Sequence, residues 1–215
     1  MHIPHIDFGG TAGCVAVIAT SNPPVNSLSH GTFMPRTRCS VPVPVPSAGV
    51  KHLQVAQSPD LGQVIALIEI GPKPVVAMIH WVAMRGSFEL ALFCHARVAT
   101  RSAVLALPEV KLGLMPRSHG TQRLPCLVSL ARAIDMTRGG KTQNAEIWRS
   151  TVLLDQIVDD EQAILDVAVT PAQEIARTGR WQPTRVLVAP KVEADTLLDA
   201  ARAKAARSAP HVMAR

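Results

Sequence analysis

Two acidic residues lie in apolar stretches of this sequence, and they are the side chains best suited to chemistry. Glu89 lies within "GSFELALFC", and Glu109 follows a proline in "LALPEVKLGL". Burial of a carboxylate without a partner raises its pKa toward the range that is useful for proton transfer. Two such acids around one water molecule could act as general acid and general base.

Gly86 stands at the start of the helix that is expected to carry Glu89. The first N–H groups of a helix have no partner within the helix, and the positive end of the helix dipole favours negative charge there. Glycine also lets a ligand approach the backbone closely. The amide at this position could therefore stabilise a developing oxyanion.

Residue types alone leave simpler explanations open. Glu89 could be a first-turn acid that is favoured by the helix dipole and has no catalytic role. Glu109 could lie at the end of a strand, where it faces solvent or pairs with Lys111. His80 and His95 are predicted to be packing residues.

The hydrophobic pattern predicts the elements that position these residues. Strands are predicted at 14–20, 74–80 and 152–158, and in two short runs around Pro108 and Glu109. Helices are predicted at 58–70 with Ser58 as the cap, from near Gly86, at 127–140, directly after Asn144, at 159–179 with a break or kink at Pro171, and at 193–209. Strands that alternate with helices favour an α/β fold.

The length of 215 residues fits a single domain. We divide it into a core at 1–150 and a C-terminal helical region of the same domain at 151–215. Residues 30–57 are predicted to be an irregular connector, because the proline in "VPVPVP" cannot donate to a sheet ladder. A misread stretch of coding DNA is another explanation of this segment.

Composition argues against several classes of protein. With 47% apolar and 18% charged residues, the sequence is typical of a globular domain, and no apolar run reaches the roughly 20 residues of a membrane span. The N-terminus lacks a signal-peptide pattern, so we expect a cytoplasmic protein. The net charge of +6 is not arranged as a basic strip with aromatic residues, so nucleic acid is not an expected partner. The four cysteines lack metal-ligand spacing and are predicted to be buried reduced thiols, and no metal is expected.

Several stretches carry a resemblance to a known family. They are "VAVIATSNPPVNSLS", the long segment from "KPVVAMIHW" to "MTRGGK", and the regions "LLDQIVD" and "AARAKAAR". The most specific part is "PEVKLGL" followed by "GTQRLP". The sequence resembles the crotonase (enoyl-CoA hydratase/isomerase) superfamily, and most closely the hydratase/isomerase domain of bacterial multifunctional fatty-acid oxidation proteins.

The resemblance implies an α/β fold in which ββα units form a spiral with C-terminal helices, with one early unit incomplete in this chain. It also implies a homo-oligomer based on trimers. The substrate would be an acyl-CoA thioester, with no separate cofactor. No GxGxxG motif follows a strand, so a nicotinamide is not expected.

The resemblance also implies a role for each candidate residue. Glu89 would activate a water molecule, Glu109 would supply a proton to the α-carbon of an enoyl-CoA, and the Gly86 amide would hold the thioester oxygen. The positions matched to the substrate are Val25, Ser27, Arg85, Pro108 and Arg117.

The sequence departs from the family where the backbone is usually bare. In place of "HGxAxGGGxE" the chain has Trp81, Arg85 and Ser87 at glycine positions, and in place of "PGAGGTQRLP" it has Arg117 and His119. These side chains would crowd the acyl pocket or resist positive φ angles, although the two arginines could instead contact CoA phosphates. The segment resembling "FSAGAD", which supplies the second oxyanion donor, has no counterpart here.

We therefore predict an enoyl-CoA hydratase/isomerase-like protein of fatty-acid β-oxidation, which adds water to, or shifts, the double bond of an enoyl-CoA thioester. The alternative is a catalytically inactive paralogue that binds acyl-CoA or acts only as an assembly partner. The missing donor favours this alternative, since one such donor is worth on the order of 10² to 10³ in rate.

Overall fold

The computed structural model describes residues 5–12, 15–21, 61–71, 73–160, 162–189 and 194–208. The predicted connector at 30–57, the predicted cap Ser58 and the substrate positions Val25 and Ser27 lie outside these residues. The described strands form three small sheets, with the orders β1-β2, β3-β5-β8 and β4-β6-β7.

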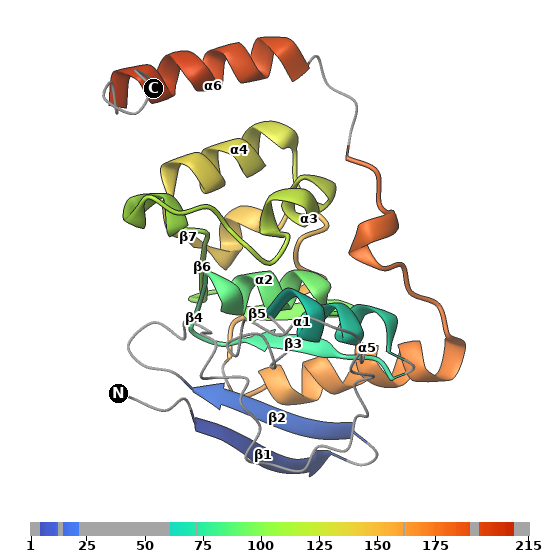
Figure 1. Ribbon diagram of the computed structural model, residues 1–215. Coiled ribbons are helices and arrows are strands. Elements are labelled where there is room, and N and C mark those ends of the chain that lie inside the picture. The colour runs from blue at the N-terminus through green and yellow to red at the C-terminus, as the bar shows by residue number, and fades with distance from the viewer. Residues whose placement is uncertain are drawn as a thin grey trace, which may run out of the picture.

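The strands are short and the helices lie between and around them (Figure 1). The strands are β1 His5–Ala12, β2 Val15–Ser21, β3 Val76–Ile79, β4 Val82–Met84, β5 Ala96–Thr100, β6 Val104–Ala106, β7 Gln143–Asn144 and β8 Gln156–Val158. The α-helices are α1 Leu61–Ile70, α2 Gly86–Phe93, α3 Gly120–Leu127, α4 Leu130–Gly139, α5 Ile164–Thr178 and α6 Ala194–Ser208. The 3-10 helices are η2 Glu109–Leu112, η3 Ala145–Trp148 and η4 Thr184–Val186.

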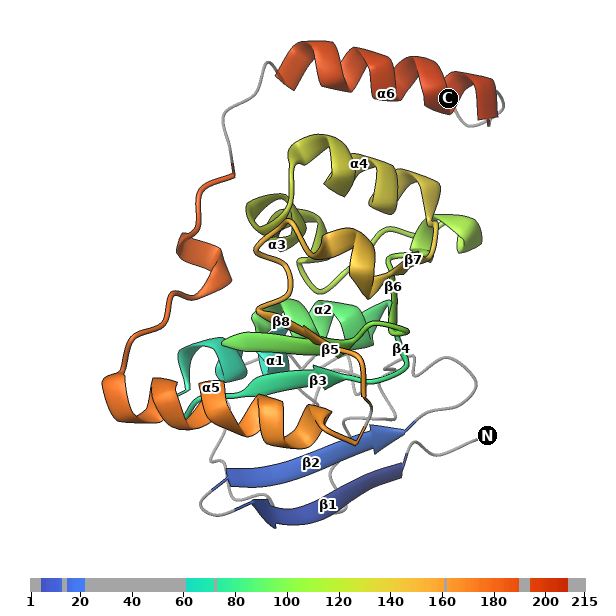
Figure 2. The same cartoon turned by 180° about the vertical axis from the view of Figure 1, so that it is seen from behind.

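Strand β5 is buried along its whole length, because helices cover both faces of its sheet. Successive residues of a strand point to opposite faces. Val98 packs with Ile164 of α5, whereas Ala99 belongs to the larger core that contains Phe88 of α2. Figures 1 and 2 show α5 on one side of this sheet and α1 and α2 on the other.

Two successive ββα units bring the candidate residues to one edge. The first is β3-β4-α2 and the second is β5-β6-α3, with η2 between β6 and α3. β3 pairs in parallel with β5, and β4 pairs in parallel with β6. The ends of β4 and β6 therefore lie side by side, with Gly86 just after the first strand and Glu109 just after the second.

Several predicted elements differ from the structure. The strand predicted at 152–158 is observed only as β8 Gln156–Val158, the helix predicted at 159–179 begins at Ile164, and β4 and α3 were not predicted. Glu109 does not lie in a strand, because β5 and β6 both end before Pro108 and Glu109 begins η2. The helix predicted at 127–140 begins at Leu130, since Ser129 has extended backbone and its side chain accepts the N–H of Arg132. The helix α5 continues through Pro171 instead of breaking there, and it packs against β3 and β5.

Strand β1 was not predicted from the sequence. Its residues "HIDFGGTA" alternate polar and apolar side chains only over the first four positions, and two glycines then interrupt the pattern, so the strand signal is short. It pairs antiparallel with β2, and the register shifts between Phe8 and Thr11. The pairing with a predicted strand, rather than local sequence, identifies this element.

Of the cysteines in the described residues, Cys94 and Cys126 are free, and Cys94 is buried as predicted. Burial raises the pKa of the Cys94 thiol to about 12, so it stays protonated at neutral pH. Cys126 is only half-buried. Within the described ranges, no group of three or more His, Cys, Asp or Glu residues is placed to hold a metal ion.

None of the helices in the described part of the chain combines the length and the apolar character that a membrane crossing requires.

Candidate active site

Glu89 lies in the first turn of α2 and is only 3% exposed. Its Oε1 accepts backbone hydrogen bonds from the N–H of Ser118 at 2.8 Å and from the N–H of Gly120 at 3.0 Å. Burial raises the pKa of Glu89, while these two hydrogen bonds and the charge of His119 act in the opposite direction. The carboxylate is therefore removed from water but held in place by the backbone.

Gly120 makes this close contact possible. A Cβ atom at this position would lie 3.0 Å from Oε1 of Glu89 and 3.3 Å from Cδ1 of Leu107. Sequence reasoning did not identify the amides of Ser118 and Gly120 as partners of Glu89, because they are 29 and 31 residues away along the chain. The signal that could have found them is the glycine in "HGTQRLP".

Glu109 is the first residue of η2 and is 5% exposed. Its Oε2 is buried and has no hydrogen-bond partner among the described residues. Burial raises the pKa of Glu109, and the charge of Glu89 raises it further, while its own backbone N–H and the charge of Arg85 lower it. The simpler explanation, a solvent-facing acid at the end of a strand, is therefore wrong.

The two acids interact although 20 positions separate them in the sequence. The electrostatic effect of Glu89 on Glu109 requires their carboxyl groups to be near each other. The N–H of Arg85 donates to the C=O of Ala106 at 3.1 Å, which joins the residue before Gly86 to the strand that leads to Glu109. The structure thus brings Glu89, Glu109 and Gly86 into one region.

This arrangement can now be compared with known proteins. Residues 48–208, more than half of the chain, match the family model described as Enoyl-CoA hydratase/isomerase. The chain belongs to the enoyl-CoA hydratase/isomerase family. The predicted relationship to the crotonase superfamily is confirmed, and so is the α/β crotonase-like fold.

Similar proteins include one curated relative and several solved structures. The peroxisomal bifunctional enzyme of Danio rerio is 36% identical over 173 residues, which cover 72% of this chain and 24% of that protein. The chain therefore spans about a quarter of this relative's length. Pseudomonas aeruginosa DspI is 25% identical with a TM-score of 0.62, and the match covers 97% of this chain and 85% of that chain. An enoyl-CoA hydratase from Thermoplasma volcanium GSS1 has a TM-score of 0.61 at 22% identity, over 95% of this chain and 89% of that chain, and this likeness concerns the fold alone.

Two residues of this member of the enoyl-CoA hydratase/isomerase family have a backbone conformation with positive φ, which is usual for glycine. Arg85 has φ 57° and ψ −131°, and His119 has φ 64° and ψ 16°. They are the non-glycine residues with positive φ in the described part of the chain, and both stand at positions where the resemblance leads us to expect glycine. Such a conformation costs on the order of 1 to 3 kcal/mol for a residue with a side chain. At these two positions the chain has a backbone conformation typical of glycine, although the residues carry side chains.

The other predicted site residues differ in how close they lie to the acids. Arg85 is half-buried and lowers the pKa of Glu109, which places its charge near that carboxyl group. Pro108 is half-buried and directly precedes Glu109. Arg117 is exposed.

The two histidines have different environments. His95 packs as predicted: its Nδ1 accepts the N–H of Val75 at 3.1 Å, and its ring centroid lies 4.0 Å from that of Trp181. The packing role predicted for His80 is wrong, because its side chain is exposed at the end of β3.

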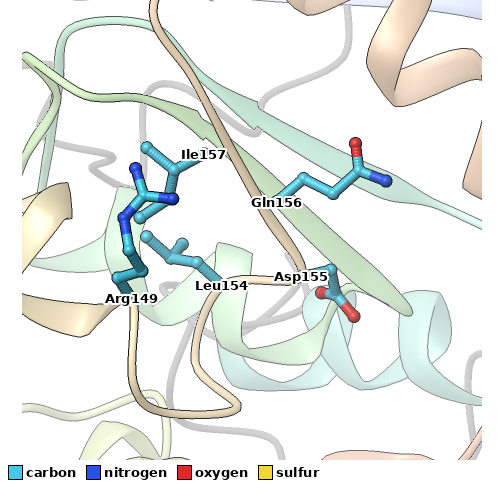
Figure 3. A pocket seen from close by; sticks show the side chains of 5 residues that line it. All are labelled: Arg149, Leu154, Asp155, Gln156 and Ile157. Atoms are coloured by element: carbon cyan, nitrogen blue, oxygen red, sulfur yellow. The ribbon is translucent and has the colours of Figure 1, made fainter.

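A pocket of about 370 Å³ lies away from the two acids (Figure 3). Its lining comes from the segment around β8 and consists of Arg149, Leu154, Asp155, Gln156 and Ile157. A second pocket, of about 430 Å³, is lined by residues of the segments 126–132 and 150–152. Neither of these pockets contains Glu89, Glu109 or Gly86 in its lining, so the acid pair is a separate, buried feature of the fold.

Proposed function

We propose that this chain acts as an enoyl-CoA hydratase/isomerase domain of fatty-acid β-oxidation, which adds water to, or shifts, the double bond of an enoyl-CoA thioester. The observation that carries the proposal is the pair of buried acids, Glu89 and Glu109, beside the start of α2 at Gly86, in which the charge of Glu89 raises the pKa of Glu109. Family membership supports the same class of substrate.

In the proposed hydration, the two acids have different roles. Ionised Glu89 takes a proton from water as the water oxygen bonds to the β-carbon of the enoyl group. The electron pair of the double bond moves toward the thioester, and its oxygen becomes an enolate that the Gly86 N–H stabilises. Protonated Glu109 then gives its proton to the α-carbon. One water molecule is consumed, and proton exchange between the acids restores the starting state.

The surroundings of each acid support this division of roles. The two amide hydrogen bonds on Glu89 favour its ionised form, which a general base requires. The charge of Glu89 favours the protonated form of Glu109, which a proton donor requires. Because the two groups interact, their titration belongs to the pair.

The remaining parts of the proposal follow from the sequence and the family. Val25, Ser27, Arg85, Pro108 and Arg117 are proposed to line the acyl-CoA site. The thioester is the substrate and no separate cofactor is proposed. We further propose a division into a core at 1–150 and a C-terminal region at 151–215 within one domain, assembly as a trimer-based homo-oligomer, and a cytoplasmic location.

The test is hydration of crotonyl-CoA by the purified chain, followed by the loss of enoyl-thioester absorbance. The wild type is expected to exceed Glu109→Gln in kcat by on the order of 10² to 10⁴, the usual contribution of general acid–base catalysis. Equal activity in both proteins would remove Glu109 from the reaction.

The alternative proposal is a family member that binds acyl-CoA, or assembles with other chains, without turnover. The observation that favours it is the strained backbone at Arg85 and His119, where side chains occupy positions at which a bare backbone is expected. Absence of crotonyl-CoA hydration would favour this alternative. Isothermal titration with an acyl-CoA then separates a chain that binds the thioester without turnover from one that acts only in assembly.

A further inference from the structure

A buried ion pair joins α1 to α3, the helix whose first residue contacts Glu89. Nη2 of Arg123, in α3, lies 2.6 Å from Oε2 of Glu69, in α1, and the two residues are 9% and 1% exposed. The other carboxylate oxygen of Glu69 accepts the N–H of Arg185 at 3.1 Å. The guanidinium carbon of Arg123 also lies 3.5 Å from the centre of the Phe93 ring. This cluster of Glu69, Phe93 and Arg123 joins three helices and η4.

The cluster is directly connected to the groups that hold Glu89. Phe93 lies one helical turn after Glu89 on α2. Arg123 lies in the first turn of α3, three residues after Gly120, whose N–H binds Oε1 of Glu89. The N–H of Arg123 donates to the C=O of His119 at 3.0 Å, so the backbone between the cluster and the amides is itself hydrogen-bonded.

A buried ion pair is not an efficient way to stabilise a fold. The desolvation of both charges offsets much of their attraction, and apolar residues of similar volume are often equally stable or more so. Nε of Arg123 is also buried without a partner among the described residues. A role in geometry explains the pair better than a role in stability, because a planar guanidinium that bonds Glu69 through Nη2 and lies over the Phe93 ring fixes the distance and direction of both partners.

We propose that Arg123 is a positioning residue, which uses its contacts with Glu69 and Phe93 to fix the start of α3 against α2 so that the amides of Ser118 and Gly120 stay on Glu89. This inference rests on the proposed function for its catalytic meaning. Its structural content, the hydrogen bonds on Glu89, can be measured whether or not the chain turns over a substrate.

The experiment compares the Glu89 carboxyl pKa, measured by NMR titration of carbon-labelled glutamate in the full chain, among wild type, Arg123→Met and Glu69→Gln. Loss of the positioning weakens both amide hydrogen bonds, so both variants are expected to raise the pKa of Glu89 by about one unit. A direct charge effect would instead move it in opposite directions, because one variant removes a positive charge and the other a negative one. Opposite shifts, or no shift in either variant, would overturn the proposal.

Arg97→Met is the matched control. Arg97 is similarly buried, at 5% exposure, and its side chain bonds the C=O groups of Leu153, Cys94 and Ala91, of which Ala91 lies in α2. Among the described residues its hydrogen bonds and its ion pair with Asp155 involve no residue of α3. Arg97→Met is expected to lower stability and to leave the Glu89 pKa within a few tenths of a unit of the wild-type value. A shift in this control as large as that in Arg123→Met would reduce Arg123 to a general structural role.

Two further measurements keep the proposal open to refutation. If Arg123→Met does not fold, Arg123→Lys is compared with Glu69→Gln, because lysine keeps the charge and is expected to restore the Glu89 pKa at least halfway to wild type. Hydrogen exchange at Ser118 and Gly120 is expected to become at least tenfold faster in Glu69→Gln than in wild type. Unchanged exchange at both amides would contradict the proposal. If the wild type has no hydratase activity, the proposed function fails while these measurements still decide the role of Arg123.

Discussion

Glu89 and Glu109 are both buried acids near the start of short helices, but their surroundings differ. Oε1 of Glu89 is held by two backbone amides, that of Ser118 just before α3 and that of Gly120 at its first residue. Oε2 of Glu109 is buried with no partner among the described residues. A carboxylate that is already satisfied keeps its position and its charge, whereas an unsatisfied one gains most from protonation or from a ligand. This difference fits the proposed roles, in which Glu89 is a fixed base and Glu109 is the proton donor.

The first prediction concerns a substitution that removes the carboxylate of Glu109, whose Oε2 has no partner among the described residues. Glu109→Gln is expected to reduce kcat for crotonyl-CoA hydration by on the order of 10² to 10⁴ with a small change in KM, because proton transfer occurs only in the transition state. Steady-state kinetics measure both constants. A large rise in KM with unchanged kcat would show that Glu109 contributes only to binding.

The second prediction concerns a substitution that displaces the carboxylate of Glu89, which two backbone amides hold in place. Gly120→Ala places a Cβ atom 3.0 Å from Oε1 of Glu89 and 3.1 Å from its Cγ, so Glu89 must move. We expect kcat to fall by on the order of 10², since small misplacements of a catalytic group have effects of this size. Gly139→Ala is the control, because its Cβ would meet only Cγ of Lys141 at 3.7 Å. Equal effects of both substitutions would argue against a special role for Gly120.

The third prediction concerns pH. The folded-state pKa of Glu109 is raised from 4.5, so its contribution to stability is fully present below about that pH and is lost as pH rises through the folded pKa. Glu109→Gln lacks this loss. It is expected to be more stable than wild type at pH 7 by on the order of 1 kcal/mol, with the difference vanishing in acid.

Urea unfolding at several pH values measures this difference. Glu89→Gln is the comparison, and it is expected to gain less stability at neutral pH, because the ionised Glu89 already accepts two amide hydrogen bonds. A larger gain for Glu89→Gln than for Glu109→Gln would reverse the comparison between the two acids.

The smallest predicted effect concerns the backbone around the acids. Arg85→Gly is expected to stabilise the fold by about 1 kcal/mol, because φ 57° with ψ −131° is a conformation that glycine adopts readily. His119→Gly is expected to gain less, since its ψ of 16° lies in the left-handed region that some side chains tolerate. Urea denaturation measures both, and a loss of stability in Arg85→Gly would show that its side-chain contacts outweigh the strain.

Local sequence was sufficient for the elements whose signals are local. Apolar periodicity identified the helix observed as α1, and β-branched runs identified β2 and β3. The short helix predicted after Asn144 is observed as the 3-10 helix η3, but the Asn144 side chain does not cap it. Glu109 was placed correctly beside an apolar run but in the wrong kind of element, because a proline before a short helical turn resembles the end of a strand.

The rest depends on contacts between distant segments, which one sequence does not reveal. The amides on Glu89 come from the start of α3 and the segment just before it, and Glu69 and Arg123 are 54 residues apart. The resemblance to the family supplied the pairing of Glu89 with Glu109, but nothing in the pattern of residues predicted which of their oxygens would be satisfied. The side chains of Arg85 and His119 were expected to resist positive φ angles, but both residues adopt them.

The central claim is that Glu89 and Glu109 form one interacting pair, and NMR titration of the Glu109 carboxyl group tests it most directly. Glu89→Gln removes the negative charge that raises the pKa of Glu109, so this pKa is predicted to fall relative to wild type. An unchanged Glu109 pKa in Glu89→Gln would contradict the account, since two acids that share one water molecule cannot titrate independently.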